Sequence, residues 1–168
     1  MSKIVYIDMD GVLVNLQAEI EFAEKHLDSK WPWDIFKNPD PIDGAVEAFN
    51  YLCNSSKYDV YILSTAPWNM PASWSHKRRW VSKYLGENAH KRLILSNHKN
   101  LCHGDYLIDD RTANGADKFN GELIQFGTEK HPDWESVLKY LKENEEYKSL
   151  NTGQKSFINE RNYFGSQR

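Results

Sequence analysis

Two carboxylates near the N-terminus have a spacing that suits chemistry at phosphorus. Asp8 and Asp10 follow the apolar run Ile4–Ile7, and at a strand end residues two apart project from the same face. Gly11 comes next and allows a sharp turn close to a ligand. A carboxylate can attack phosphorus, and a second acid beside it can protonate the leaving oxygen and later deprotonate water. The pair therefore indicates Asp8 as nucleophile and Asp10 as acid–base.

Three more apolar runs end in polar residues that the same chemistry needs. These residues are Ser64 and Thr65 after Val60–Leu63, Lys99 shortly after Leu93–Leu95, and Asp109 and Asp110 after Tyr106–Ile108. The carboxyl ends of parallel strands lie along one edge of a sheet, where ligands bind in the crevice. A transferring phosphoryl group needs its oxygens neutralised there, and Thr65 as donor and Lys99 as cation meet that need.

The carboxylates of this set also predict a metal ion. Asp8, Asp10 and Asp110 offer oxygen ligands, and acids this close repel one another unless a proton or cation intervenes. Oxygen ligands select a hard cation, and Mg²⁺ suits few carboxylates with water and a substrate phosphate. The sequence leaves open whether Asp109 or Asp110 contacts the metal directly. Arg111 is expected behind the ligands, holding a carboxylate by a bidentate pair.

Several of these residues also have simpler structural interpretations. Asp8 and Asp10 alone are compatible with a solvated turn, and Thr65 with the cap of a following helix. Lys99 lies in a polar loop, where lysine is common. Lys77 is a second candidate for a phosphate contact, but its basic neighbours equally indicate the solvated face of a helix.

Apolar runs and helical patterns alternate along the chain. The expected strands are Ile4–Ile7, Val60–Leu63, Leu93–Leu95, Tyr106–Ile108 and Leu123–Phe126. Helical spacing of apolar residues predicts helices near 45–53, 80–85 and 134–141, with Asp43 as N-cap of the first and Gly86 ending the second. This alternation predicts an α/β fold, with a Rossmann-like parallel sheet and helices on both faces.

The segment 14–42 interrupts the alternation and predicts a small helical cap inserted after the first strand. It holds one helical pattern, followed by an aromatic stretch and closely spaced prolines. The expected core domain comprises residues 1–13 and 43–143, and residues 144–168 are expected to form a polar tail.

The composition excludes several classes of protein. With 168 residues, 40% of them hydrophobic, and a net charge of −3, the chain fits one domain without global attraction to nucleic acid or an anionic membrane. Cys53 and Cys102 form no metal-binding spacing or disulfide framework, which suits a reducing cytoplasm. We also expect neither a signal peptide nor a membrane span, because the apolar stretches are short.

The four motifs resemble those of the haloacid dehalogenase superfamily. The stretch from Asp8 to Val12 (DMDGV) resembles its DxDG(T/V) motif, and the later motifs match Thr65, Lys99 and the pair Asp109-Asp110. A closer resemblance, to the 5'(3')-deoxyribonucleotidases, is carried by residues 8–13 (DMDGVL), 64–67 (STAP), 77–84 with the glycine at 86, and 107–111 (LIDDR). By this resemblance Asp8 is nucleophile and Mg²⁺ ligand, Asp10 is proton donor and backbone ligand, and Asp110 is the remaining protein ligand.

The resemblance also implies where a nucleoside would bind. The family places it between aromatic cap residues and the core, so Trp31, Trp33 and Phe36 are candidates for the stacking surface or, alternatively, for the cap's own core. The chain departs from the mammalian pattern in a shorter insertion, in Leu16 at the place of an aromatic base contact, and in Ala66 at the place of a serine. The resemblance therefore supports the assignment of the catalytic residues better than that of the residues that would bind the substrate.

The leading functional hypothesis is a cytoplasmic, Mg²⁺-dependent phosphatase that acts on deoxyribonucleoside monophosphates through an aspartyl phosphate. The alternatives are a phosphatase of the same type for another small phosphoester, such as a sugar phosphate, and a non-catalytic nucleotide-binding module. No nucleic acid polymer or membrane is expected as a partner. A homodimer is left open, since family members are often dimers and the sequence shows no interface signal.

Overall fold

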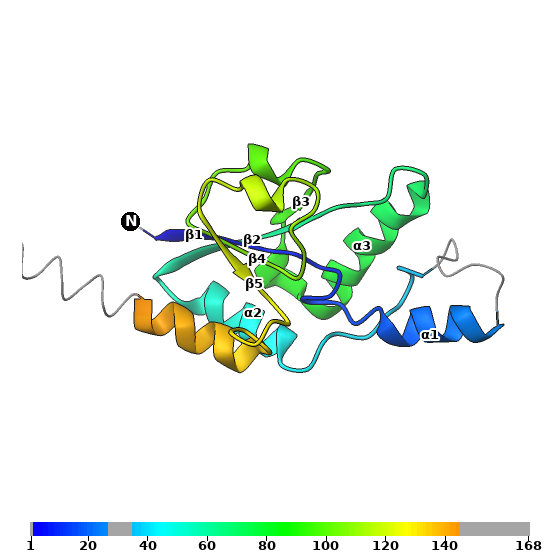
Figure 1. Cartoon of the computed structure of the whole chain (residues 1–168), viewed down its shortest axis with the longest axis horizontal. Helices are drawn as coiled ribbons and strands as arrows, with labels where there is room; N and C mark the ends of the chain where they lie inside the picture. Colours follow the sequence, from blue (N-terminus) through cyan, green and yellow to red (C-terminus); the bar gives the residue numbers. More distant parts are fainter. Residues whose placement is uncertain (1, 27–34, 145–168) are drawn as a thin grey trace, which may run out of the picture.

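Five parallel strands form the centre of the computed structural model, which describes residues 2–26 and 35–144. They are β1 (Lys3–Ile7), β2 (Tyr58–Ser64), β3 (Leu93–Leu95), β4 (Tyr106–Asp109) and β5 (Glu122–Gln125). Their order is β3-β2-β1-β4-β5, and every neighbouring pair is parallel (Figure 1). The predicted α/β fold with a Rossmann-like parallel sheet is confirmed.

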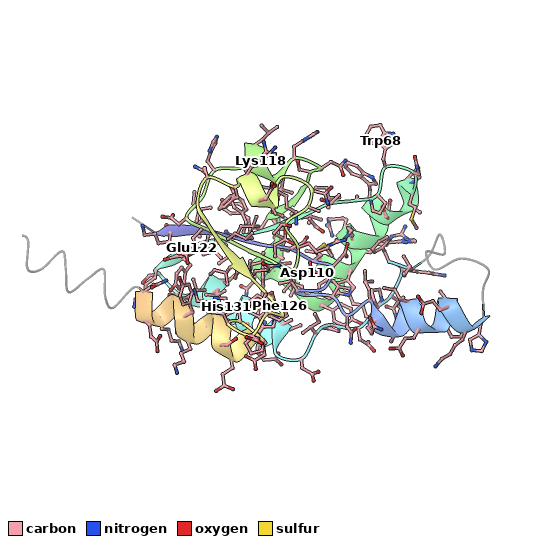
Figure 2. The ribbon with its side chains drawn as sticks, viewed as in Figure 1. Trp68, Asp110, Lys118, Glu122, Phe126 and His131 are labelled. Carbon is pink, nitrogen blue, oxygen red and sulfur yellow. The ribbon has the colours of Figure 1, made fainter. Side chains whose placement is uncertain are left out.

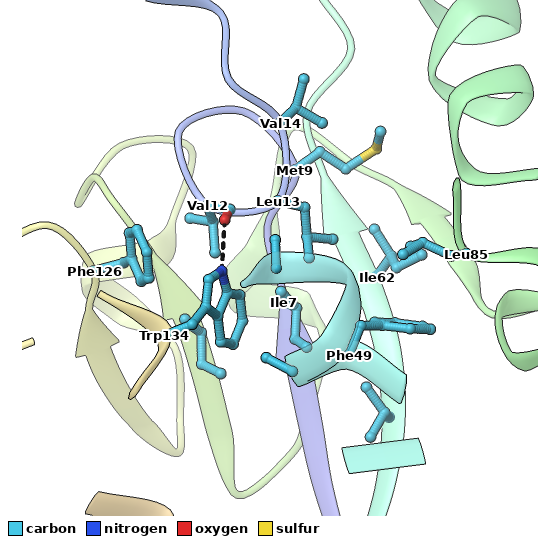
Figure 3. Close-up of a cluster of buried hydrophobic side chains, with 14 of the residues drawn as sticks. Ile7, Met9, Val12, Leu13, Val14, Phe49, Ile62, Leu85, Phe126 and Trp134 are labelled. Atoms are coloured by element: carbon cyan, nitrogen blue, oxygen red, sulfur yellow. Dashed lines mark hydrogen bonds between the residues drawn. The ribbon is translucent and has the colours of Figure 1, made fainter. Parts of the chain in front are cut away.

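One face of the sheet packs against the longer helices. These are α2 (Ala45–Asn54), α3 (Pro71–Tyr84) and a helix over residues 134–144. Alternate strand residues such as Val5 and Ile7 enter this core and are fully buried. Phe49 of α2 and Trp134 of the last helix meet them from the helical side (Figure 3).

The other face carries a smaller core. Tyr6 and Leu107, which alternate with residues of the larger core, pack there with Phe119. Short 3₁₀ helices lie along the segments that follow β3 and β4, η2 (Lys99–Leu101) and η3 (Ala116–Lys118), and η1 (Gly86–Ala89) follows α3. The strands are thus covered on both faces, as their nearly continuous apolar sequences predicted.

The helix boundaries differ from the sequence-based expectation in two places. Asp43 is not the N-cap of α2; Gly44 is, with a φ of 77° and no side-chain cap, so that prediction was wrong. Helix α3 begins at Pro71, well before the apolar pattern that predicted it, because proline suits the first helical turn. Gly86, also at positive φ, follows the last residues of α3 as expected.

The two ends of the segment 14–42 lie side by side, just beyond the end of β1. The Asn15 amide donates to the carbonyl of Asp40 (2.8 Å), and the Ile42 amide donates to that of Leu13 (2.9 Å). Helix α1 (Gln17–His26) extends beyond the carboxyl end of the sheet (Figure 1). We propose on these grounds that 14–42 is a cap inserted into a core of 1–13 and 43–143.

Part of the expected cap and tail falls outside the described residues. Trp31 and Trp33 lie there, and so does all of the tail beyond Asn144. Within the described residues, no helix has the length and apolar character needed to cross a membrane.

Candidate active site

The strand order reverses between β1 and β4, and their carboxyl ends lie side by side. Ile7 pairs with Ile108, and the Asp8 amide donates to the Ile108 carbonyl (2.9 Å). A crevice outside such a reversal is the usual ligand site of an open parallel sheet. The sequence therefore brings Asp8 and Asp109 together from positions about one hundred residues apart, as the strand-end argument predicted.

Lys99 lies between these two carboxylates. Its Nζ is 3.0 Å from Asp8 Oδ2 and 2.5 Å from Asp109 Oδ2, and all three side chains are buried. The Lys99 amide donates to the Asn114 carbonyl (2.8 Å), which fixes the start of η2 against the loop after β4. A buried ammonium beside two buried carboxylates compensates part of their charge. Lys99 thus lies beside Asp8 at the edge of the sheet where the sequence placed it, and its contact with a phosphoryl group stays a prediction.

Asp10 has a different cationic partner. Lys77 Nζ lies 2.6 Å from both of its carboxylate oxygens and 3.1 Å from Ser64 Oγ. Only 1% of the Lys77 side chain is exposed, so the interpretation of Lys77 as part of a solvated basic face is wrong. The reason is helical geometry, because α3 turns Lys77 inward while the adjacent Arg78 points to solvent.

Three acidic side chains form a cluster that fits a hard cation. Asp8, Asp109 and Asp110 each offer an oxygen atom, and these atoms lie within 4.8 Å of one another. Among the described residues, Asp8 Oδ1 and Asp110 Oδ1 are buried without a hydrogen-bond partner, although the Arg111 Nε lies 3.7 Å from the latter. A buried polar atom without a partner needs an explanation, and a bound ion is one. Carboxylate oxygens are ligands that Mg²⁺ prefers.

Gly11 permits the close approach of the first loop to this cluster. Its φ is 76°, and a Cβ at this position would lie 2.5 Å from Asp110 Oδ2. Glycine is therefore required both for backbone conformation and for space. The Asp10 side chain is turned toward Lys77 and is not one of the clustered acids, which agrees with the implied role of its backbone rather than its carboxylate as a ligand.

Burial raises the proton affinity of the acids around the site. Desolvation raises the pKa of Asp10 against the opposing charge of Lys77, with a further rise from Asp8. The pKa of Asp109 rises to about 6, chiefly by burial and then by repulsion from Asp8. Burial also raises the pKa of Asp110 although Arg111 opposes it. Each rise favours a proton or a cation at these oxygens.

Thr65 and Arg111 both lie at the same edge of the sheet. The Thr65 hydroxyl donates to the Ser96 carbonyl (3.0 Å), and the α3 helix begins only at Pro71. The alternative that Thr65 caps this helix is therefore wrong. The Arg111 backbone amide donates to Asp109 Oδ1 (3.0 Å), while its guanidinium stays half exposed beside Asp110 without the predicted bidentate pair.

A cavity of about 650 Å³ opens beside these residues, between the sheet and the segment 14–42. Its polar wall includes Asp10, Thr65, Asp110 and Arg111. Its apolar wall consists of Val14, Leu16, Ile20, Phe36, Ile42, Pro67 and Met70. The volume lies within the range of small-molecule sites. Figure 2 shows Asp110 near the centre of the molecule and Trp68 projecting outward from the loop after β2.

Some residues of this cavity were not predicted from the sequence. Asn15, Gln17 and Asn114 contribute polar groups to its lining. Asn114 has a φ of 53° and precedes Gly115, and an Asn-Gly pair is a recognised turn signal. That signal predicts the turn but not its place beside the acids. Trp31 and Trp33, the predicted stacking residues, lie outside the described residues, whereas Phe36 lines the cavity.

Comparison with protein families identifies the chain. The family described as "5' nucleotidase, deoxy (Pyrimidine), cytosolic type C protein" matches residues 26–139. The chain belongs to this family. The description of this family names a 5' nucleotidase, and nucleotidases are phosphoric monoester hydrolases. The sequence-based assignment of the family and of the enzyme class is confirmed.

Individual relatives agree with this family. A putative 5'(3')-deoxyribonucleotidase of Vibrio phage KVP40 is 51% identical over 146 residues, which cover 83% of this chain and 85% of the phage protein. The mitochondrial 5'(3')-deoxyribonucleotidase of Mus musculus is 32% identical over 106 residues, which cover 62% of this chain but 43% of the mouse protein. The chain thus matches most of the phage deoxynucleotidase and less than half of the mouse enzyme. A solved haloacid-dehalogenase-family hydrolase from Deinococcus radiodurans is similar at 15% identity and a TM-score of 0.46, over 83% of this chain and 88% of that one.

Proposed function

We propose that this protein hydrolyses deoxyribonucleoside monophosphates to nucleoside and phosphate through an aspartyl phosphate on Asp8. The observation that carries the proposal is the state of Asp8 itself. Its side chain is buried, Oδ2 is paired with Lys99 at 3.0 Å, and Oδ1 has no hydrogen-bond partner in the part of the chain that the structure describes. A buried carboxylate oxygen without a partner is available for attack on a phosphoryl group, and the nearby residues Asp10, Gly11 and Asp110 line the cavity in which a phosphoester could bind.

In the first step Asp8 forms a bond to phosphorus, and the bond from phosphorus to the nucleoside oxygen breaks. The leaving oxygen takes a proton from Asp10, a residue that lines the cavity and whose pKa is raised by burial. Thr65 and Lys99 are proposed to neutralise the oxygens of the transferring group. The wall position of Asp10 and Thr65 supports these roles.

In the second step water replaces Asp8 at phosphorus. Asp10, now ionised, accepts the proton of the attacking water. The bond from Asp8 to phosphorus breaks, so the Asp8 carboxylate is restored and phosphate is released. One acid thus serves as donor and then as acceptor. Its two roles require that the Asp10 carboxyl keep the same place through both steps.

We propose Mg²⁺ as the cofactor, held by Asp8, Asp110 and the backbone of Asp10, with Asp109 and Arg111 behind them. The fit rests on the clustering of Asp8, Asp109 and Asp110, and on Oδ1 of Asp110, which is buried without a hydrogen-bond partner among the described residues. Bound Mg²⁺ supplies positive charge to the phosphoryl oxygens.

The apolar wall supports a nucleoside rather than a sugar as the leaving group. Leu16, Ile20, Phe36 and Met70 offer apolar surface beside the acids, and Phe36 adds an aromatic ring. A base has apolar faces that such a wall can cover, whereas a sugar phosphate offers none. We also propose a cytoplasmic location, as the word "cytosolic" in the family's description suggests.

An assay of phosphate release tests the proposal. Deoxy- and ribonucleoside monophosphates and common sugar phosphates are each incubated with Mg²⁺ or with a chelator, using the wild type and Asp8→Asn. We expect Mg²⁺-dependent turnover of deoxyuridine or thymidine monophosphate that the substitution abolishes. Turnover of sugar phosphates alone would contradict the substrate class. Binding of nucleotides without any turnover would favour a non-catalytic module.

A further inference from the structure

Lys77 is buried in the site, and its hydrogen-bond donors already have partners. An ammonium group has three N–H donors. Lys77 Nζ meets three acceptors, the two carboxylate oxygens of Asp10 at 2.6 Å each and Ser64 Oγ at 3.1 Å. A phosphate oxygen would therefore have to displace one of these acceptors before it could bind Lys77.

The remaining side of this ammonium is covered by Phe36. The ring centroid lies 4.8 Å from Lys77 Nζ, and Phe36 is itself buried. A cation over an aromatic face at this distance is an attractive contact. Phe36 belongs to the segment 14–42, so this segment completes the surroundings of Lys77 and limits the access of water.

Lys99 differs from Lys77 in this respect. Among the described residues, its ammonium contacts two carboxylate oxygens, one from Asp8 and one from Asp109. One of its three donors is therefore left for an oxygen of a bound phosphoryl group. The two buried lysines of the site thus have different capacities for a phosphate.

We propose that Lys77 is a positioning residue that holds the Asp10 carboxyl at the wall of the cavity, and not the phosphate contact that the sequence suggested. The inference rests on the proposed role of Asp10 as acid–base. Asp10 follows β1, whereas Lys77 lies on α3, so the contact fixes the carboxyl from a separate rigid element. Without the ammonium, the Asp10 carboxyl has no fixed partner and turns toward solvent.

A double-mutant cycle tests whether Lys77 acts through Asp10. The variants are Lys77→Met, Asp10→Asn and the double variant, assayed for release of deoxyuridine from its monophosphate in a single turnover for the rate and at steady state for KM. We expect Lys77→Met to lower the rate about 100-fold, since small misplacements of a reacting group have costs of this order. We expect KM to change little and the double variant to be no slower than Asp10→Asn. If the double variant is slower than Asp10→Asn by the same factor that Lys77→Met loses alone, or if KM rises greatly, the proposal is overturned.

Two conservative variants and a control complete the design. Lys77→Arg and Lys77→Gln retain donors toward Asp10, and we expect each to recover part of the rate even if Lys77→Met folds poorly. Arg79→Met removes an exposed cation from the same helix and is expected to match the wild type. A rate for Lys77→Arg and Lys77→Gln no better than that of a folded Lys77→Met would contradict the positioning role.

Crystal structures supply a readout that does not depend on activity. We expect the Asp10 carboxyl to leave its wild-type position in Lys77→Met or, if that variant does not fold, in Lys77→Ala, and to keep it in Arg79→Met. An Asp10 carboxyl that stays in place without Lys77 would overturn the inference whether or not the wild type is active. A wild type without phosphatase activity but with a displaced Asp10 in the variant would instead contradict only the proposed function.

Discussion

The ammonium of Lys99 lies 3.0 Å from Oδ2 of Asp8, and the same ammonium contacts Asp109. All three groups are buried, so water screens their charges weakly. Lys99 therefore compensates the buried carboxylates in the folded chain, and in the proposed mechanism it has a second task, as a cation for the transferring phosphoryl group.

Substitution Lys99→Met is expected to impair both tasks. We expect the rate of phosphate release to fall about 100- to 1,000-fold, as for loss of one charge-stabilising donor. We expect the free energy of unfolding to fall by about 3–5 kcal/mol, because uncompensated carboxylates remain buried. Phosphate assays and urea denaturation measure the two effects. Lys118→Met, at an exposed position, is the control and should change neither.

Gly11 provides a test of how closely the first loop approaches the acids. In Gly11→Ala a Cβ would lie 2.5 Å from Asp110 Oδ2, and the residue would keep a φ of 76°. Gly86→Ala is a matched control, since Gly86 has a φ of 56° and nothing within 4 Å of a Cβ. We expect a loss of about 1 kcal/mol for the control and a larger loss, with loss of activity, for Gly11→Ala. If urea denaturation shows the same loss of unfolding free energy in both variants, and Gly11→Ala stays active, the close approach of Gly11 to Asp110 is contradicted.

Mg²⁺ is expected to stabilise the folded chain. At a concentration about 100 times the dissociation constant, a bound ligand adds about 2.7 kcal/mol, which raises the melting temperature by about 5–10 °C for a chain of this size. We expect Asp110→Asn to lose most of this rise, because Asp110 is one of the clustered acids. Asp117→Asn, at an exposed position in η3, should keep it. Thermal melts with and without Mg²⁺ measure this rise. If Mg²⁺ raises the melting temperature of Asp110→Asn as much as that of the wild type, Asp110 is not a ligand.

Much of this architecture follows from the sequence. The strands are near-continuous apolar runs, and polar residues begin where the chain leaves the sheet, so the strands and the residues at their carboxyl ends were predictable. Asp8, Thr65, Lys99 and Asp110 were all predicted to lie at this edge, and the structure brings them there.

The partners of the charged side chains were not predictable in the same way. Lys77 and Asp10 are 67 residues apart, and their contact depends on the rotation of α3 about its axis. The apolar pattern of α3 was apparent only in its second half, but Lys77 lies three and four residues before Trp80 and Val81, so helical spacing places it on the same buried face. The sequence did not show which carboxylate it would meet there. The Gly44 cap was missed because the chain enters α2 in a left-handed conformation that leaves Asp43 out of reach.

His131 provides a test of pH dependence away from the site. It is 4% exposed, and its Nδ1 has no hydrogen-bond partner within residues 2–26 and 35–144. Burial together with the nearby charge of Lys130 lowers its pKa against a weaker opposing effect of Glu122. The unfolded chain, with a histidine pKa of about 6.5, therefore takes up the proton first as the pH falls. The contribution of the neutral His131 ring to the free energy of unfolding is therefore fully present above about pH 6.5, the pKa in the unfolded chain. It is lost as the pH falls from there toward the lower pKa of the folded chain.

Substitution His131→Gln is expected to weaken this dependence between pH 7.5 and 5.5. The comparison concerns the slope of the unfolding free energy against pH, because the substitution can also change its absolute value. His90→Gln is the control, since His90 is exposed. Urea denaturation at several pH values measures the slopes. An unchanged slope in His131→Gln would show that other groups cause the acid sensitivity.

Trp134 links the last helix to the loop that carries Gly11. Its indole N–H donates to the Val12 carbonyl (3.0 Å), and its ring packs against Phe126 (Figure 3). In Trp134→Phe the buried carbonyl loses its donor, which costs about 1–3 kcal/mol. Because Val12 follows Gly11, we also expect a higher Mg²⁺ concentration for half-maximal activity.

Substitution Trp80→Phe is the matched control for this link. Trp80 is equally buried, and its indole N–H donates to a backbone carbonyl at 2.8 Å, but that carbonyl belongs to Pro39 and not to the loop of Gly11. We expect a similar loss of stability in urea denaturation and an unchanged Mg²⁺ requirement. If both variants shift the Mg²⁺ requirement equally, the effect comes from general loosening of the core, and the bond from Trp134 to Val12 has no specific role in supporting the metal site.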